Sequence, residues 1–405
     1  MSTHHDICIQ GSGIVARTLA LLLAKERFRV ALVSEAKVAS ATGEKADVRA
    51  YALNSASKSL LESLRVWPNT DAGTAHATPV LSMQVHGDTT GRVNFSAAEH
   101  GSEALAWIVD VPALEEQLLQ AVKYQPLITT IEQVASAHLQ NSNTAIRRDL
   151  TVICEGKNSV TRDELGVPFD VTPYHQHAIA ARLTGTLPHN NQALQWFKNG
   201  DKNGDKNGDK NSEIVAFLPL SEPNQPHPGN SVALVWSVSE DRAKELMALT
   251  GDEFAAEVSM HSEHALGEMT LYSERATWPL QLALASKWVG KDAHLGSWAL
   301  AGDAAHTVHP LSGQGLNLGL ADAADLAKTL GAKEYWRSVG DVKLLRRYER
   351  ARKLDALALG AVTDGLQQLF ARSESPLQAL RNWGMQGFER SGGLKQWVTK
   401  RAMGL

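Results

Sequence analysis

The chain has 405 residues, 43% of them hydrophobic and 21% charged, which is the composition of an ordinary globular protein. Lys and Arg number 40 against 44 Asp and Glu, and the net charge of −4 does not indicate nucleic-acid binding. These figures exclude collagen-like, disordered and disulfide-stapled classes. Cys8 and Cys154 alone are too few for a metal cluster and favour a reducing compartment.

A strand, a turn, a helix and a second strand are predicted at the start of the chain. Residues 7–9 form a short apolar run, and residues 15–23 carry apolar side chains at helical spacing. A second apolar run covers residues 30–33. Two strands on either side of a helix predict a right-handed parallel βαβ unit.

The turn between the first strand and the helix carries Gly11, Gly13 and Ala16, the spacing of a dinucleotide-binding fingerprint. Gly11 permits the tight turn, Gly13 admits a pyrophosphate, and Ala16 lets the helix approach the strand. The free N–H groups of the helix start would then face the phosphates. Glu35 ends the second strand 22 residues after Gly13, where a carboxylate can accept both ribose hydroxyls.

The middle of the chain predicts a different architecture. Residues 80–95 and 179–236 hold short, partly alternating apolar runs broken by Gly, Pro and Asn, which is typical of an antiparallel sheet. Within the second of these ranges the sequence Asn-Gly-Asp-Lys occurs three times in tandem from Asn199 to Lys210. This polar repeat favours a solvated tether over a calcium loop, because the sixth position from Asp201 is Lys206 and not glycine.

Two further motifs follow a predicted strand at residues 298–301. In the first, Gly302-Asp303-Ala304-Ala305-His306, Asp303 could hydrogen-bond a cofactor hydroxyl or simply cap a helix. The second, residues 309–317, is a Gly-rich turn that opens a long helix, and a helix N-terminus stabilises developing negative charge. His306 and His309 have no third partner, so no metal site is expected.

Together these segments resemble the flavin-dependent aromatic hydroxylases, the para-hydroxybenzoate hydroxylase-like superfamily, and within it the ubiquinone-biosynthesis hydroxylase family. The family's Gly-Asp-Ala-Ala-His, His-Pro and Gly-Gln-Gly-Leu-Asn-Leu-Gly-Leu pattern is matched at residues 302–320. Residues 47–53 resemble its Arg segment, and residues 216–220 and 278–280 resemble strands of its substrate sheet. Residues 150–162 resemble its Asp-Gly motif, with Glu155 in place of the usual Asp before Gly156. The likeness extends over nearly the whole chain.

The resemblance implies an α/β fold, α+β overall, in which a Rossmann-like FAD domain is interleaved with an antiparallel substrate domain. The expected boundaries are 1–75, 100–172 and 285–340 for the FAD domain, 76–99 and 173–284 for the substrate domain, and 341–405 for C-terminal helices. It also implies FAD-binding roles and, at Phe217 and Pro219, a substrate pocket. The implied FAD contacts are Gly11, Gly13 and Ala16 (pyrophosphate), Glu35 (ribose), Arg49 (flavin and phosphates), Asp303 (ribityl or pyrophosphate region), and Pro310, Gly313, Gly315 and Asn317 (isoalloxazine).

The implied activity is hydroxylation of an aromatic ring, with a polyprenylated phenol of ubiquinone biosynthesis as the substrate. NAD(P)H would reduce FAD, and O2 would add at C4a to give the hydroperoxide that transfers its distal hydroxyl. No catalytic acid or base is identified. Two alternatives stay open: a flavoenzyme of this fold acting on a soluble aromatic or as a prenyl reductase, and a non-catalytic FAD scaffold in a biosynthetic complex.

Two features bear on the location of the protein. No run reaches the roughly 20 apolar residues of a membrane span, and residues 1–10 lack a signal-peptide pattern, so we expect a cytoplasmic protein. The C-terminal stretch combines aromatic residues such as Trp383 and Trp397 with basic ones such as Arg381 and Arg401. It predicts ordinary helix packing with a basic face, or a surface for a membrane or partner protein.

Overall fold

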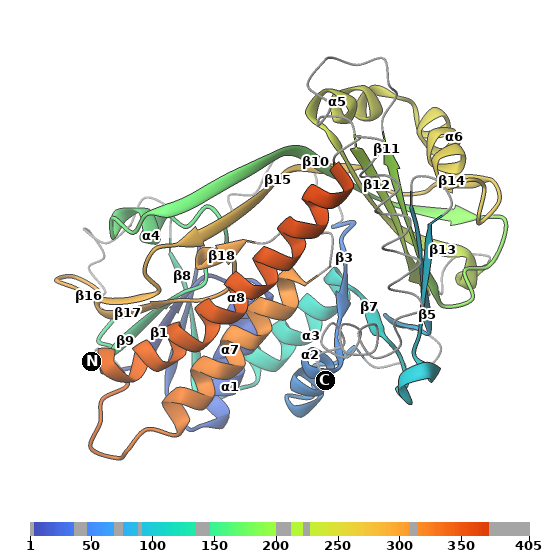
Figure 1. The fold of residues 1–405 in the computed structure, drawn as a ribbon. Helices are drawn as coiled ribbons and strands as arrows, with labels where there is room; N and C mark the ends of the chain where they lie inside the picture. Colours follow the sequence, from blue (N-terminus) through green and yellow to red (C-terminus); the bar gives the residue numbers. More distant parts are fainter. Residues whose placement is uncertain are drawn as a thin grey trace.

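A computed structural model describes residues 4–35, 47–68, 76–87, 91–133, 146–199, 212–221, 227–307 and 314–371 (Figure 1). It shows a mixed α/β architecture in which a parallel sheet covered by helices adjoins a large, mainly antiparallel sheet. The predicted fold class is therefore confirmed.

The first sheet has the strand order β16-β17-β9-β1-β2-β8. All neighbouring strands in it pair in parallel except β16 with β17. Helix α1 (Ile14–Lys25) connects β1 to β2, which confirms the βαβ unit. The strands are β1 (Ile7–Gln10), β2 (Val30–Glu35), β8 (Ile128–Gln133), β9 (Leu150–Ile153), β16 (Val289–Asp292) and β17 (Gly296–Leu300).

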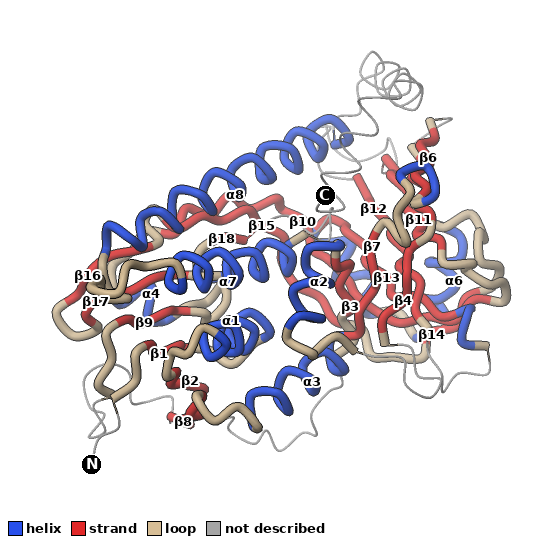
Figure 2. The backbone as a smooth tube through the Cα atoms, turned by 90° about the horizontal axis from the view of Figure 1, so that it is seen from below, coloured by secondary structure: helices blue, strands red, loops and turns tan. Residues whose placement is uncertain are grey.

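Four helices accompany this sheet: α1, α3 (Val111–Lys123), α7 (Gly315–Gly331) and α8 (Val342–Ala371). Helix α1 packs against α3 and α7, and α8 lies along α7, as Figures 1 and 2 both show. Apolar side chains at helical spacing, such as Leu19 and Leu23 of α1 and Leu320 and Leu326 of α7, are fully buried in this core. Two short helices complete the unit, α2 (Ser55–Ser63) and α4 (Val160–Glu164).

The second sheet has nine strands, in the order β18-β15-β10-β13-β12-β11-β5-β6 with β14 beside β10. The antiparallel pattern predicted from the sequence is confirmed, apart from β5 and β11, which pair in parallel. The strands are β5 (Ser82–His86), β6 (Arg92–Ser96), β10 (Phe169–Gly185), β11 (Gln192–Asn199), β12 (Ser212–Leu220), β13 (Ser231–Ser239), β14 (Met269–Leu271), β15 (Ala276–Ala285) and β18 (His306–Thr307).

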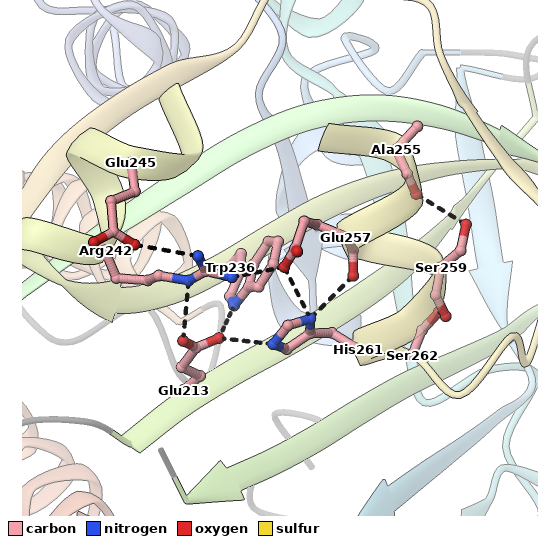
Figure 3. A network of polar contacts seen from close by, with 9 residues as sticks. All are labelled: Glu213, Trp236, Arg242, Glu245, Ala255, Glu257, Ser259, His261 and Ser262. Carbon is pink, nitrogen blue, oxygen red and sulfur yellow. Dashed lines mark hydrogen bonds and ion pairs between the residues drawn. The ribbon is translucent and has the colours of Figure 1, made fainter. Parts of the chain in front are cut away.

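One face of this sheet is covered by α5 (Glu240–Ala248) and α6 (Gly251–His261). A polar network fixes both helices to the sheet (Figure 3). Trp236 donates its indole N–H to Glu213 at 3.0 Å, and Arg242 of α5 bonds Glu257 of α6 at 2.6 Å. His261 lies 3.5 Å from Glu213. The helices therefore close one face of the sheet and leave the other face for the interior of the molecule.

A small sheet, β3 (Ala50–Leu53), β7 (Ala106–Asp110) and β4 (Ala77–Val80), joins the two large ones. The 17-residue strand β10 and its partner β15 also run from one unit into the other (Figure 1). The register of this pair shifts between Pro173 and His177, beside the expected domain boundary at residues 172/173. The division into domains stays a prediction. The Asn-Gly-Asp-Lys repeat after Asn199 and the C-terminal stretch from residue 372 lie outside the described residues.

Candidate active site

A cavity of about 920 Å³ lies where the three sheets meet. One end is lined by the start of α1, the start of α7 and the turn after β17; we call this the helix end. The other end, the sheet end, is lined by the face of the large sheet that α5 and α6 leave free. Gly13 of the first glycine-bearing turn and Gly315 at the end of the second therefore line the same cavity.

Gly11 and Gly13 play different parts in the first turn. Gly11 has φ +120°, and a Cβ there would stand 2.3 Å from the carbonyl oxygen of Cys154 on the neighbouring strand. Gly13 lines the cavity, has an ordinary φ of −76°, and a Cβ there would meet no atom within 4 Å. The fold itself requires glycine at position 11, whereas at position 13 glycine keeps the cavity open.

The start of α7 lies beside the start of α1. A Cβ on Gly319 would stand 2.7 Å from Val15, and one on Gly302 would stand 3.3 Å from the same side chain. Gly315 lines the cavity and, like Gly13, has nothing within 4 Å of an added Cβ. In the described residues neither N-cap side chain bonds the first turn of its helix, so both helix starts bring backbone N–H groups to the cavity wall. Pro310 and Gly313 lie outside the described residues.

Asp303 is an acidic residue of the helix end that the sequence singled out. It follows β17 in a short 3-10 turn and projects into the cavity. Burial raises the pKa of its carboxyl group, and the opposite charges of His306 and Lys157 partly offset that rise. Lys157 lines the same part of the cavity and was not found by the sequence reasoning. The signal was its position directly after the Glu155-Gly156 motif.

Arg49 also lines the helix end. Its guanidinium donates to both carboxylate oxygens of Asp47, with Nε–O distances of 2.9 and 3.1 Å, and to the hydroxyl of Tyr51. Burial raises the pKa of Asp47, but the hydrogen bonds and charge of Arg49 outweigh it, and the net shift is downward. The ion pair leaves Arg49 beside the cavity as a positioned donor.

Asn317 does not line the cavity, contrary to the expectation that it contacts a flavin ring. Its Oδ1 accepts from the backbone N–H of Asn54 at 3.0 Å and from the Ser57 hydroxyl at 2.7 Å. Its Nδ2 donates to the carbonyl of Ala52 at 2.8 Å. The amide of this buried residue thus ties α7 to β3 and α2. Asn317 follows the cavity-lining Leu316 on the helix, so its side chain points to a different side of the helix axis.

The structure also places the end of β2 and Glu155, which stands where the resembled family has Asp. Strand β2 ends at Glu35 as expected, but the Glu35 side chain lies outside the described part of the chain. The Glu155 carboxylate accepts from the hydroxyls of Ser159 and Thr161 at 2.7 and 2.6 Å, and from the Thr161 N–H at 3.0 Å. The longer acid therefore holds the start of α4 and leaves Gly156 lining the cavity.

At the sheet end, Phe217 and Pro219, the residues expected in a substrate pocket, lie on the strand face that turns away from the cavity. Alternation along β12 turns Phe217 toward α5 and α6, where it is fully buried with Trp196 at a ring distance of 5.3 Å. Pro219, two residues along the strand, is buried on the same face as Phe217, and neither residue lines the cavity. The described lining of the sheet end is formed instead by alternate residues, among them Ala193 and Gln195 of β11, Ile214, Ala216 and Leu218 of β12, and Ala233, Val235 and Ser237 of β13.

The helix end has the groups that FAD requires. Two uncapped helix starts offer N–H donors to phosphate and to negative charge on the ring, and Asp303 offers an acceptor for hydroxyls. Open space above Gly13 and Gly315 lets a ligand approach the backbone. The residues present fit the cofactor.

Comparison with known proteins identifies the family. A family model described as "FAD binding domain" matches residues 4–361. The chain belongs to this family of FAD-binding monooxygenases. It is 30% identical over 413 residues to 3-demethoxyubiquinol 3-hydroxylase of Escherichia coli, covering 99% of this chain and 98% of that protein. It is 29% identical to ubiquinone hydroxylase UbiL of Rhodospirillum rubrum, covering 98% of this chain and 89% of the relative.

Solved structures agree on the fold. The structure of PqsL, a probable FAD-dependent monooxygenase from Pseudomonas aeruginosa, superposes with a TM-score of 0.70 at 20% identity, over 94% of this chain and 100% of the other. This chain is thus a flavoenzyme that uses FAD as its cofactor, as predicted. Its family implies NAD(P)H, O2 and an aromatic compound as co-substrates. Among the described residues no helix is long and apolar enough to cross a membrane.

Proposed function

We propose that this flavoenzyme hydroxylates the aromatic ring of a polyprenylated phenol in ubiquinone biosynthesis. The observation that carries the proposal is the single cavity that joins two uncapped helix starts to an apolar sheet floor. Two of its relatives are named as ubiquinone hydroxylases or as acting on demethoxyubiquinol, over almost their whole length. When bound, FAD supplies the redox chemistry, by the C4a-hydroperoxide route that the family resemblance implies.

The residues of the helix end have distinct tasks in this proposal. The N–H groups at the start of α1, beside Gly13 and Ala16, bind the diphosphate, and Gly11 shapes the turn that presents them. Glu35 accepts from the adenosine ribose, and Asp303 from hydroxyls of the ribityl chain. Arg49 lies near the flavin and the phosphates, held in place by Asp47.

The start of α7 is assigned to the flavin ring. Its free N–H groups and partial positive charge, at Gly315 and Leu316, stabilise negative charge on the reduced ring. Pro310 and Gly313 belong to the same segment. Asn317 positions this helix start through its bonds to Ala52 and Asn54 and is a positioning residue in this scheme.

The sheet end is assigned to the substrate. Its lining consists mainly of small and branched apolar side chains, which suit an aromatic ring with an isoprenoid chain and keep water from the reacting atoms. Because the described lining of the sheet end is mainly apolar, the chain contributes binding, orientation and charge stabilisation more than proton transfer.

Purification followed by absorbance spectroscopy and NAD(P)H oxidation assays tests the proposal. We expect a yellow protein whose NAD(P)H oxidation accelerates with a phenol carrying a prenyl chain and yields a product with one more hydroxyl group. A phenol with the same ring and no chain is the matched control, and a faster rate with that control would favour a soluble aromatic substrate. A protein that binds FAD but oxidises NAD(P)H with none of the phenols would support the scaffold alternative.

A further inference from the structure

Gln195 stands out among the side chains at the sheet end of the cavity. It lies on β11, its relative exposure is 6%, and it lines the cavity. Its amide makes no hydrogen bond to any residue in the described part of the chain, and it opens to the cavity. An amide without a protein partner in a largely apolar cavity is a group that a ligand there can hydrogen-bond.

The side chains beside Gln195 cannot hydrogen-bond its amide. Strand pairing places Gln195 beside Ala216 of β12, which lies beside Val235 of β13, and the row continues through Ala180 of β10 to Ala276 of β15. The row is therefore one amide followed by four small or branched apolar side chains. A flat apolar ligand lying along this row would meet one long hydrogen-bonding group, at the β11 end.

We propose that Gln195 is a specificity-determining residue whose amide hydrogen-bonds an oxygen substituent of the substrate ring. The inference rests on the proposed function, since it takes the sheet end to be the substrate site. A glutamine amide both donates and accepts, so it can bind a phenol hydroxyl or a methoxy oxygen.

The charges at this end select a neutral ring. Arg275 is the cation among the described residues that line the sheet end, and its guanidinium donates to the carbonyls of Leu246 and Leu249 at 2.8 and 2.7 Å. Arg49 and Lys157 lie at the helix end. A carboxylate bound beside Gln195 would thus lose its hydration without gaining a cation, which is unfavourable. The site accepts oxygenated neutral rings and discriminates against benzoates.

Substrate-analogue binding to the FAD-loaded enzyme without NAD(P)H tests the proposal, followed by flavin absorbance and calorimetry. The probes are 2-prenylphenol, prenylbenzene, and the same phenol carrying a carboxylate. We expect wild-type protein to bind the phenol at least about tenfold more tightly than either of the others, the effect of one or two completed hydrogen bonds. Equal affinity for the phenol and its carboxylate analogue would overturn the neutral-ring preference.

Gln195→Leu and Gln195→Met separate the role of the amide from the packing of the pocket. Both variants fill similar space, so prenylbenzene affinity should hold or rise while the preference for the phenol falls to about one. The matched control is Gln84→Leu on the neighbouring strand β5, where Gln84 lies outside the cavity and bonds Asn94. This control should keep the wild-type preference.

Two results would overturn the inference in distinguishable ways. If Gln195→Leu and Gln195→Met keep the preference for the phenol, Gln195 does not contact the ring oxygen, while the proposed function stands. If the wild-type holoenzyme binds neither prenylated compound, the proposed function fails and the inference fails with it. During turnover, the loss of this contact should also lower the fraction of oxidised NAD(P)H that yields hydroxylated product, because the ring is less firmly oriented.

Discussion

At the helix end of the cavity the lining comes from turns that precede helices, whereas at the sheet end it comes from alternate positions of strands. A turn such as Gly11–Gly13 keeps its chemistry in a few consecutive residues. A sheet face collects mainly alternate residues of β11, β12 and β13 together with residues of β10 and β15, which are far apart in the chain. The first kind of site can be read as a motif, and the second depends on register.

The difference predicts separate consequences for mutation. At the helix end, backbone groups are the proposed ligands, so a side chain added to a cavity-lining glycine should abolish binding without unfolding the chain. At the sheet end, neighbouring residues on one strand should affect either substrate recognition or stability. The following variants test this contrast.

Gly13→Val should have the largest effect on function. The new side chain enters the space proposed for the FAD diphosphate, yet meets no protein atom within 4 Å of its Cβ. We expect a folded protein from which FAD is absent after purification, measured by absorbance and by circular dichroism. Gly11→Ala is the matched control, because its Cβ collides with Cys154 and its φ is positive. It should lower the free energy of unfolding by about 2–5 kcal/mol.

Asp322→Asn tests the support beneath the helix end. The fully buried Asp322 accepts from His306 at 2.6 Å, from Arg352 at 2.8 Å and from the N–H of Gly302 at 2.9 Å. Loss of its charge removes the one fully buried carboxylate that Arg352 contacts among the described residues and leaves it Asp355 and Asp325, which are partly exposed. We expect the free energy of unfolding to fall by about 3–5 kcal/mol in urea titrations. An unchanged midpoint would show that this network contributes little.

The same variant predicts a pH dependence. Burial raises the pKa of Asp322, but the charges and hydrogen bonds of His306 and Arg352 outweigh it and hold the pKa below its ordinary value. The stabilisation is therefore fully present above the unfolded-state pKa of about 3.9 and is lost as the pH falls through the lower folded-state pKa. The stability difference between wild type and Asp322→Asn should be constant near neutral pH and shrink below about pH 4.

Phe217→Ala and Ala216→Val form a neighbouring pair on β12. Phe217 is fully buried under α5 and α6, so its truncation should cost about 3–5 kcal/mol of stability and leave substrate KM nearly unchanged. Ala216 lines the cavity, so the larger valine should raise KM for a prenylated phenol with a change in unfolding midpoint of only a few degrees. If Phe217→Ala raised KM and Ala216→Val lowered stability instead, the substrate would lie on the other face of the sheet.

Asp303→Asn should have the smallest effect. Asp303 is exposed to the cavity, so water reaches its carboxylate in the apoprotein and the amide should change the melting temperature little. The amide is a weaker acceptor for a cofactor hydroxyl. We expect FAD affinity about tenfold lower. Unchanged affinity would remove Asp303 from the cofactor site.

The sequence allowed much of the helix end to be predicted. The βαβ unit, the strand before Gly302 and the helix from Gly315 are all present as expected, because glycine spacing and apolar periodicity are local signals. Asn317 was misplaced because a helix distributes consecutive residues around its axis, so Leu316 faces the cavity while Asn317 faces α2. For Lys157, the one signal in the sequence was its position directly after the Glu155-Gly156 motif.

The sheet end could not be predicted in the same way. Both faces of β12 are apolar near Phe217, so alternation alone does not tell which face meets the cavity. That choice depends on α5 and α6, whose position follows from the network around Glu213 and Arg242. Gln195 lies in the segment Leu-Gln-Trp-Phe, and its importance is visible only once its neighbours prove to be apolar.

A crystal structure of the FAD-loaded protein tests the central claim most directly. The account predicts the diphosphate at the N–H groups that follow Gly13, and the flavin ring between the start of α7 and the floor of the large sheet. A diphosphate bound away from the start of α1, or a ring outside the cavity that Gly13 and Gly315 share, would contradict it.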